Sequence, residues 1–448
     1  MRILIITPEY RGFGGGIMTF YRHLAPALTE AGHEVFVIEG SGFGIAGRSA
    51  AETPGGIHIR SLDTSLLSKW MQRFAHFTAA PTLRRLMASS WAAWDQARSL
   101  GRFDVVEVVE FGLLHAPHAL RPLAPTVAQC HAGWGQMGLH ESSCGQELDR
   151  ATALAIESEA LRHMSARHTY ALANSRWWAD QLHLPFSCIR PPWKPPSDSP
   201  PRQRSTEIDP VIRVFGRIQA WKGPRECCQA LSLAPEIPSL EWYGRDVAVD
   251  SNGTSTNDLM RSEFPAVWGT RILTRNPVPP QEVSRLQATA LLNLVPSTWD
   301  VFNFTAAEAM ASARPVICSD GAGASELIED GRTGFVYDGS SAAALADVMR
   351  RALSLGPAEL ARIGAAGREA ALAALDPMRQ AAAHATGYES AMRSPVMAEG
   401  GPPAWFKALA EPREPSERVG ASHLDQHPLR GLASYVVKRG LRKAGLAS

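Results

Sequence analysis

The chain has 448 residues, of which 45% are apolar and 20% charged, with a formal net charge of +1. This length exceeds one ordinary core and predicts two domains with the composition of a soluble globular protein. The small net charge argues against nucleic acid as a partner, because such proteins carry clustered basic side chains. No run approaches 18 apolar residues, and Pro8 and Glu9 follow the first apolar run, so neither a membrane span nor a signal peptide is expected.

Six cysteines occur without zinc-like spacing, and we expect reduced, buried thiols in a cytoplasmic protein. They are Cys130, Cys144, Cys188, Cys227, Cys228 and Cys318.

Residues 1–190 alternate short β-branched runs with helical stretches, which predicts a parallel sheet covered by helices. One helix is expected over Thr19–Ala31, ended by Gly32. The expected strands are Arg2–Thr7, Glu34–Ile38, Ile57–Arg60, Asp104–Val108, Thr126–Cys130, Thr169–Ala173 and Cys188–Arg190.

The helical region 66–100 is rich in aromatic side chains that could stack on sugars or lie against lipid, although core packing is the favoured role. These are Trp70, Phe74, Phe77, Trp91 and Trp94.

A proline-rich run over 191–208 predicts a semi-rigid linker, and the alternation restarts over 209–375 as a second α/β domain. Two such units joined by a hinge form a cleft, and ligands of open parallel sheets bind beyond the carboxyl ends of the strands. The expected strands are Val211–Phe215, Leu240–Tyr243, Arg271–Thr274, Leu291–Val295, Pro315–Ser319 and Gly334–Tyr337.

Residues 376–394 are expected to form a C-terminal helix that could cross back to the N-terminal domain. Residues 395–448 are expected to form a flexible or amphipathic basic tail, beginning with a tether over 395–418. The last 21 residues interleave basic and apolar side chains and contain no acid, so they could make peripheral contact with an anionic membrane. A solvated tail, or a helix packed on its own protein, is at least as consistent with this pattern.

The most informative segment runs from Pro296 to Ala311. It places Asp300 on a loop after an apolar strand and Glu308 just inside a helix. A strand that feeds a helix N-terminus leaves unpaired N–H groups and a positive dipole end, which attract anions. Carboxylates beside such a site can hold hydroxyls, which suggests a site for an activated sugar.

Arg217 and Lys222 follow the first strand of the second domain. Fixed cations there could stabilise the charge that develops on a leaving nucleoside diphosphate, although ordinary surface cations are the alternative. The chain has no D-x-D motif to bind a bridging divalent ion, so we expect no cofactor and a metal-independent reaction.

The glycine-rich segment Gly12–Gly16 lies between the first strand and the first helix, where glycines let a phosphate or sugar approach the backbone. It does not match a dinucleotide fingerprint, and a plain turn is the competing interpretation. His131 ends a predicted strand and could face the cleft, although a lone histidine is more often structural.

Together these segments resemble the GT-B glycosyltransferases, and more narrowly the retaining enzymes of glycosyltransferase family 4. The shared motifs are Gly15-Gly16, Gly32-His33-Glu34-Val35, Gly216-Arg217 through Lys222-Gly223, the Asp300/Glu308 pair with Ala309-Met310-Ala311 and Pro315-Val316, and Gly321, Glu326, Gly331, Gly334 and Phe335. The resemblance implies an α/β GT-B fold, in which two Rossmann-like doubly wound domains face each other across a cleft. The acceptor would bind on the N-terminal side and the donor on the C-terminal side.

The resemblance also implies a hexosyltransferase-like enzyme of polysaccharide or glycoconjugate biosynthesis. It would move a sugar from a nucleoside-diphosphate sugar, with retention, to a saccharide, lipid-linked or small-molecule acceptor. The implied catalytic residues are His131, Arg217, Lys222 and Asp300, and the implied donor-binding residues are Gly15, Gly16, Gly216, Asn303, Phe304, Thr305 and Glu308. The two cations would hold the diphosphate, Asp300 would contact the sugar hydroxyls, and Glu308 would bind the ribose.

Two positions depart from the family pattern, because Asp300 stands where Glu is usual and Asn303 where Gly is usual. Both would face the sugar, so the identity of the donor stays open. Two alternatives also stay open: a catalytically silent GT-B sugar-nucleotide-binding or regulatory subunit, and an NDP-sugar epimerase on the same fold. The epimerase would want further cleft acids or bases, which the sequence does not reveal.

Overall fold

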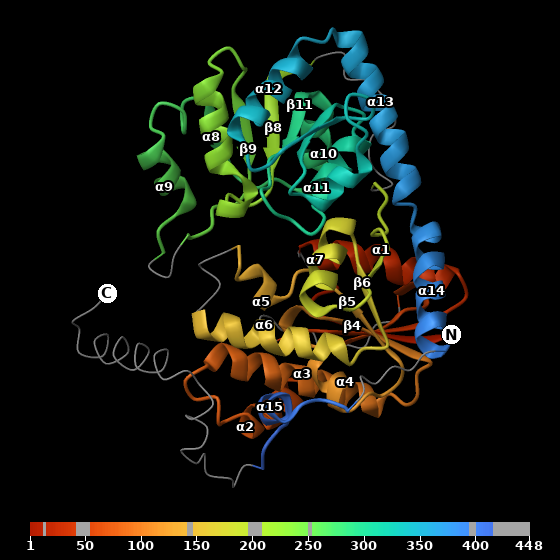
Figure 1. Ribbon diagram of the computed structural model, residues 1–448. Helices are drawn as coiled ribbons and strands as arrows, with labels where there is room; N and C mark the ends of the chain where they lie inside the picture. The colour runs from red at the N-terminus through yellow and green to blue at the C-terminus, as the bar shows by residue number, and fades with distance from the viewer. Residues whose placement is uncertain are drawn as a thin grey trace, which may run out of the picture.

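The computed structural model describes residues 1–11, 15–41, 54–140, 147–195, 208–249, 253–393 and 400–414. Within these ranges two parallel sheets build two lobes, which lie one above the other in Figure 1.

The N-terminal lobe contains a seven-stranded parallel sheet in the order β3-β2-β1-β4-β5-β6-β7, which includes the Rossmann order 3-2-1-4-5-6. Its strands are β1 Arg2–Thr7, β2 Glu34–Glu39, β3 His58–Ser61, β4 Val105–Val109, β5 Thr126–Gln129, β6 Ala166–Thr169 and β7 Ser187–Cys188. Its helices are α1 Gly16–Glu30, α2 Thr64–Arg73, α3 Pro81–Ser99, α4 Ala116–Leu120, α5 Trp134–Met137, α6 Glu147–Arg162 and α7 Leu172–Leu182.

The C-terminal lobe contains a six-stranded parallel sheet in the order β10-β9-β8-β11-β12-β13. Its strands are β8 Asp209–Phe215, β9 Leu240–Tyr243, β10 Ile272–Arg275, β11 Ala290–Val295, β12 Val316–Ser319 and β13 Phe335–Tyr337. Its helices are α8 Pro224–Leu233, α9 Thr256–Glu263, α10 Pro280–Thr289, α11 Phe304–Ala311, α12 Ala342–Leu353 and α13 Pro357–Ala374. Two further helices follow it, α14 Pro377–Arg393 and α15 Ala404–Ala410.

The central strand of the N-terminal sheet is apolar on both faces because helices cover both. Ile3 and Ile5 of β1 belong to a core cluster with α1 and α14, whereas Leu4 and Ile6 belong to a second cluster with α2, α3, α4 and α6. This alternation follows from the two-residue repeat of a strand. The first cluster continues into the C-terminal lobe through Phe302 and Phe304, so the lobes are in contact.

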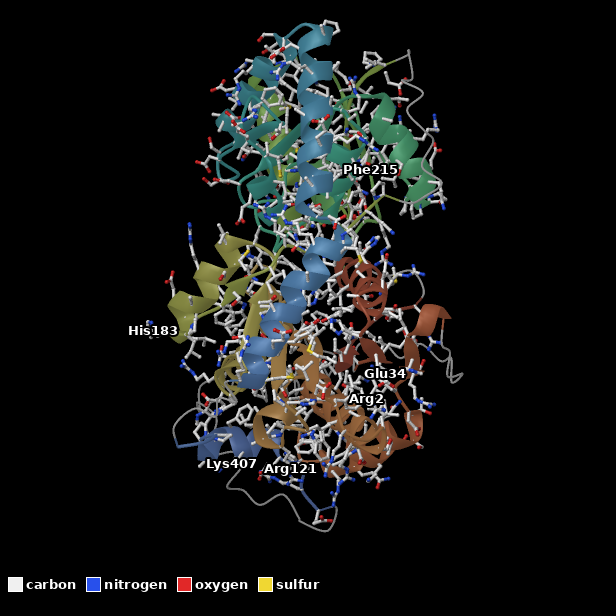
Figure 2. The ribbon with its side chains drawn as sticks, turned by 90° about the vertical axis from the view of Figure 1, so that its right-hand side faces the viewer. Arg2, Glu34, Arg121, His183, Phe215 and Lys407 are labelled. Carbon is white, nitrogen blue, oxygen red and sulfur yellow. The ribbon has the colours of Figure 1, made fainter. Side chains whose placement is uncertain are left out.

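Helix α14 crosses back from the C-terminal lobe and packs against α1, β4, β5 and β6 of the N-terminal lobe. The crossing is visible at the right of Figure 1 and at the front of Figure 2, where α14 runs down the lower lobe. A second crossing lies beside it, because the backbone N–H of Trp193 donates to the carbonyl of Leu375 at 2.8 Å. The Trp193 ring is buried.

The structure corrects one predicted strand and one helix start. The strand predicted at Thr169–Ala173 is β6, Ala166–Thr169, and α7 begins at Leu172. The sequence did not indicate this strand because it contains polar residues. Arg167 is nevertheless buried, since it donates to carbonyls at and just beyond the end of α6. The first helix begins at Gly16 rather than Thr19, before the apolar pattern starts.

The predicted tail is partly wrong. The segment predicted as a linker lies between the strands of the two lobes, and its first residues Pro191, Pro192 and Trp193 are buried. Residues 400–414, predicted as part of a tether, include α15, which packs on α4 and α6 with Phe406 fully buried. The basic segment proposed for membrane contact lies outside the described residues.

The aromatic side chains between residues 66 and 100 are buried in the second core cluster, which confirms their predicted packing role. Of the six cysteines, five lie in the described ranges and are free, and all but the partly buried Cys188 are buried. Among the described residues, no helix combines the length and the apolar character needed to cross a membrane.

Candidate functional site

Lys222 and Asp300 form an ion pair at the carboxyl edge of the C-terminal sheet. Lys222 ends a short 3-10 turn after β8, and Asp300 lies on the loop after the neighbouring strand β11. Both side chains are mostly buried, with 16% and 11% exposed. The structure therefore joins two residues that lie 78 positions apart, each predicted separately as part of a site.

Gly223 lets the two loops approach each other. Its φ is +80°, a left-handed conformation that L side chains rarely adopt, and a Cβ there would lie 2.0 Å from the carbonyl oxygen of Pro296. The Thr298 N–H donates to the Trp221 carbonyl at 3.0 Å, which fixes the loops together. The glycine after Lys222 is thus required by this close approach.

Asn303 explains one departure from the family pattern. It adopts φ +77°, a conformation natural to glycine and tolerated by asparagine. Its Oδ1 accepts the Thr305 N–H at 3.1 Å and caps α11, and its Nδ2 donates to Ser297 Oγ at 3.1 Å. The N–H groups of Asn303 and Phe304 have no hydrogen-bond partner among the described residues, and they remain available to an anion.

Glu308 lies in the middle of the eight-residue helix α11, not just inside its start as the sequence suggested. Its side chain is partly buried, and burial raises the pKa of its carboxyl to about 7. Its carboxylate makes no hydrogen bond with any described residue, so it is free to accept hydroxyl groups.

Arg217 and Gly216 lie on the loop after β8. Arg217 is exposed and has no ion pair among the described residues. Gly216 has φ +143°, with no atom within 4 Å of where a Cβ would lie. The loop therefore offers an unpaired guanidinium beside a glycine with unobstructed space at its Cα.

The glycine-rich segment of the N-terminal lobe faces the start of α11. A Cβ on Gly16 would lie 3.4 Å from Phe304 Cδ2, so the structure brings two predicted donor-binding residues from different lobes together. Gly15 is the N-cap of α1, and its N–H donates to Glu9 Oε1 at 3.1 Å. Gly12 and Gly14 lie outside the described residues.

His131 is a core residue at this junction. Its Nε2 lies 3.2 Å from the Tyr170 hydroxyl, and burial lowers the pKa of its ring to about 3, so the ring is neutral near pH 7. Tyr170 in turn packs against Phe302 and Phe304, with ring centroids 6.2 and 6.5 Å away. His131 thus reaches the C-terminal lobe through Tyr170 and makes no ion pair with Lys222 or Asp300.

Sequence reasoning missed Glu110, which lies beside His131. One of its carboxyl oxygens accepts the His131 N–H at 2.5 Å and the other accepts the Phe111 N–H at 3.2 Å. Burial outweighs these hydrogen bonds and raises the pKa of Glu110 to about 8. An acid directly after the apolar strand β4 was the available signal.

Sequence reasoning also missed an aromatic bridge between the lobes. His140 of the N-terminal lobe stacks on Trp299 at 4.0 Å between ring centroids and 9° between planes. Trp299 also contacts Trp221 at 5.1 Å, and Lys222 Nζ lies 4.4 Å from the centroid of the Trp221 ring. The aromatic rings of Trp221 and Trp299 therefore lie next to the ion pair, where the two lobes meet.

Two family models match separate parts of the chain. Residues 14–189 match Glycosyltransferase Family 4, and residues 271–370 match Glycosyl transferases group 1. The chain is therefore similar to glycosyltransferases over both of its lobes, and to family 4 over the N-terminal one. The two matches fall on the two lobes, and the second covers Asp300, Asn303 and Glu308.

Curated relatives of the chain include the D-inositol 3-phosphate glycosyltransferase of Nocardia farcinica, which is 29% identical over 52% of this chain and 49% of its own length. The alpha-maltose-1-phosphate synthase of Mycolicibacterium smegmatis is 25% identical over 58% of this chain and 68% of its own. The chain therefore spans about half the length of the first of these relatives.

Solved structures show that the fold is GT-B. Sucrose-phosphate synthase from Thermosynechococcus elongatus superposes with a TM-score of 0.68 at 18% identity, over 87% of this chain and 98% of that one. Anabaena HepE in complex with UDP-glucose superposes with a TM-score of 0.58 at 16% identity, over 86% of this chain and all of that one. The predicted fold class is confirmed.

Proposed function

We propose that this protein transfers a sugar from a nucleoside-diphosphate sugar to an acceptor hydroxyl with retention of anomeric configuration. The observation that carries the proposal is the Lys222–Asp300 ion pair at the edge of the donor-side sheet, next to the start of α11. In this proposal Lys222 would bind phosphate and Asp300 would bind sugar hydroxyls, and the ion pair holds the two side chains in contact.

The chemistry follows from where charge develops. As the bond between the sugar and the diphosphate breaks, negative charge builds on the leaving group, and preorganised cations and N–H groups lower the barrier. Lys222, Arg217 and the free N–H groups of Asn303 and Phe304 would supply these cations and N–H groups. Glu308 would accept hydrogen bonds from hydroxyls of the nucleotide ribose.

The donor we propose to test first is a UDP-sugar. This choice is supported by the HepE complexes, which contain UDP, UDP-glucose, or UDP with glucose. Thermal-shift measurements with UDP-, GDP- and ADP-sugars rank the nucleotides, because a ligand that binds the folded state stabilises it by mass action. The acceptor would be a saccharide, a lipid-linked sugar or a small molecule.

A catalytically silent subunit that binds a sugar nucleotide is the second candidate. The relatives described above have the names of enzymes, and this does not favour a silent subunit. The two candidate functions differ in whether the protein releases nucleoside diphosphate from the donor. An enzyme releases free nucleoside diphosphate by transfer or slow donor hydrolysis, whereas a silent subunit shows a thermal shift without release. Binding without release under every donor would overturn the proposed activity.

Substitution of the cation tests the proposed mechanism. Lys222→Ala should lower the rate of nucleoside diphosphate release by on the order of 10²–10³-fold, as expected when a preorganised charge-stabilising group is lost. Arg225→Ala is the matched control, since Arg225 is exposed three residues later and pairs with Glu263. A Lys222→Ala rate equal to that of the control would contradict the assigned role.

A further inference from the structure

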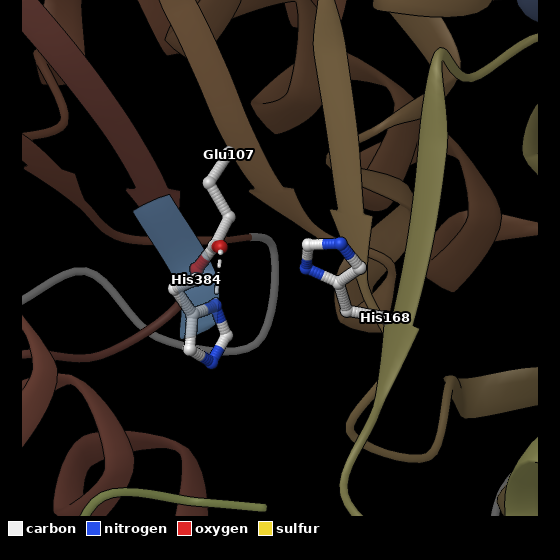
Figure 3. Close-up of side chains that lie close together, drawn as sticks. All are labelled: Glu107, His168 and His384. Carbon is white, nitrogen blue, oxygen red and sulfur yellow. Dashed lines mark ion pairs between the residues drawn. The ribbon is translucent and has the colours of Figure 1, made fainter. Parts of the chain in front are cut away.

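A group of three ligand-type side chains lies buried in the N-terminal lobe, apart from the donor-side residues. Glu107 comes from β4, His168 from β6 and His384 from α14 (Figure 3). Each is at most 1% exposed. One ligand atom from each lies within 4.8 Å of the other two.

These side chains leave polar atoms unsatisfied. Glu107 Oε1, His168 Nδ1 and both ring nitrogens of His384 have no hydrogen-bond partner among the described residues. A buried polar atom without a partner is costly, and most such atoms in folded proteins bind a protein group, water or an ion. Unsatisfied atoms on all three side chains of one cluster indicate a missing occupant.

We propose that Glu107, His168 and His384 bind one divalent transition-metal ion of the zinc type. Imidazole nitrogens and a carboxylate are ligands that zinc accepts. Neighbouring ligands of a tetrahedral zinc ion lie about 3.3 Å apart, given bonds of roughly 2.0–2.1 Å. His384 Nδ1 and Glu107 Oε2 already lie 3.5 Å apart.

The surroundings of the carboxylate fit the same role. The Tyr388 hydroxyl donates to Glu107 Oε2 at 2.6 Å, and such hydrogen bonds orient ligands around metal ions. Glu107 Oε1 has no partner, so this oxygen can complete the coordination as a bidentate carboxylate.

The ion would serve structure rather than chemistry. It would join two strands of the N-terminal sheet to α14, which arrives from the C-terminal lobe. None of its ligands belongs to the donor site, so the inference does not depend on the proposed transferase activity.

Metal content tests the site directly. The full chain is produced in medium supplemented with zinc, and in parallel with cobalt, because a buried site fills during folding. After dialysis we expect about one metal ion per chain by elemental analysis, and visible absorption bands of tetrahedral cobalt. His168→Ala and His384→Ala should each lower the metal content at least tenfold.

Two further variants distinguish loss of the metal ion from failure to fold. Glu107→Gln preserves shape and the acceptor for Tyr388, so it should fold, as checked by circular dichroism, yet lose the metal at least tenfold. His183→Ala removes an exposed histidine and should retain the metal. Wild-type protein with less than a tenth of an equivalent from both media, or Glu107→Gln with wild-type metal content, would overturn the proposal.

Discussion

Asn303 combines a left-handed backbone with a helix cap, and the two roles can be separated by substitution. Asn303→Ala loses the hydrogen bond to Thr305 and keeps the unfavourable φ, so we expect a loss of about 2 kcal/mol in the free energy of unfolding. Asn303→Gly loses the cap but relieves the strain, so its change should stay within about 0.5 kcal/mol. Chemical denaturation of both variants measures the difference, and equal losses would contradict this account.

Glu308 should make stability depend on pH near neutrality. Its pKa is raised to about 7 in the folded protein, above the ordinary value of 4.5. The folded state therefore holds the proton more tightly, and this contribution to stability is present below about pH 4.5 and lost as the pH rises through about 7.

Glu308→Gln removes this dependence. Relative to wild type, the variant should gain up to about 3 kcal/mol in the free energy of unfolding between pH 5 and pH 8. Denaturant titrations at the two pH values check it. A difference between wild type and variant that does not change with pH would show that the carboxyl titrates normally.

At the scale of elements, α15 anchors the chain after α14 to the N-terminal lobe. Phe406 is fully buried there, whereas its neighbour Trp405 is 43% exposed. Phe406→Ala should destabilise the protein by about 3–5 kcal/mol, the range for removing a buried aromatic side chain. Trp405→Ala is the matched control and should cost less than about 1 kcal/mol. Equal effects in thermal or denaturant unfolding would argue against the docking of α15.

The elements that sequence predicts well are the strands with mostly apolar runs, such as β1, β4 and β11, because burial on both faces demands such residues. Part of the site follows as well. Lys222 and Asp300 lie after strands that become neighbours, and parallel strands bring their carboxyl ends to one edge.

Other features were not predictable because they depend on contacts distant in sequence. The strand containing Arg167 and His168 has a polar sequence, which does not indicate a buried strand. Arg167 can be buried because it donates to the last turn of α6, and His168 because it lies in the cluster with Glu107. Trp193 stands in a proline-rich run, and its burial and its hydrogen bond to Leu375 become evident only in the folded structure. The stack of His140 on Trp299 needs both lobes in place.

At the scale of the whole molecule, the His140–Trp299 stack should hold the lobes together when no donor is bound. Aromatic pairs contribute about 0.5–1.5 kcal/mol beyond their buried area. Trp299→Ala should therefore shift the unliganded protein toward a more open shape, seen as a larger radius of gyration in X-ray scattering. Trp405→Ala, which alters a tryptophan far from the junction, should leave the radius unchanged. An unchanged radius in Trp299→Ala would mean that other contacts hold the lobes.

The hydrogen bond between Trp193 and Leu375 has a mechanical consequence. In the described part of the chain, it joins the segment that leaves the N-terminal lobe to the segment that returns to it, so we expect this point to act as a hinge. Opening of the lobes should then be a rotation about this point, with small displacements next to it and the largest displacements at the parts of the lobes farthest from it. Fluorescent labels attached near residues 140 and 225 would sense the rotation best, whereas labels near residues 193 and 375 would hardly move apart.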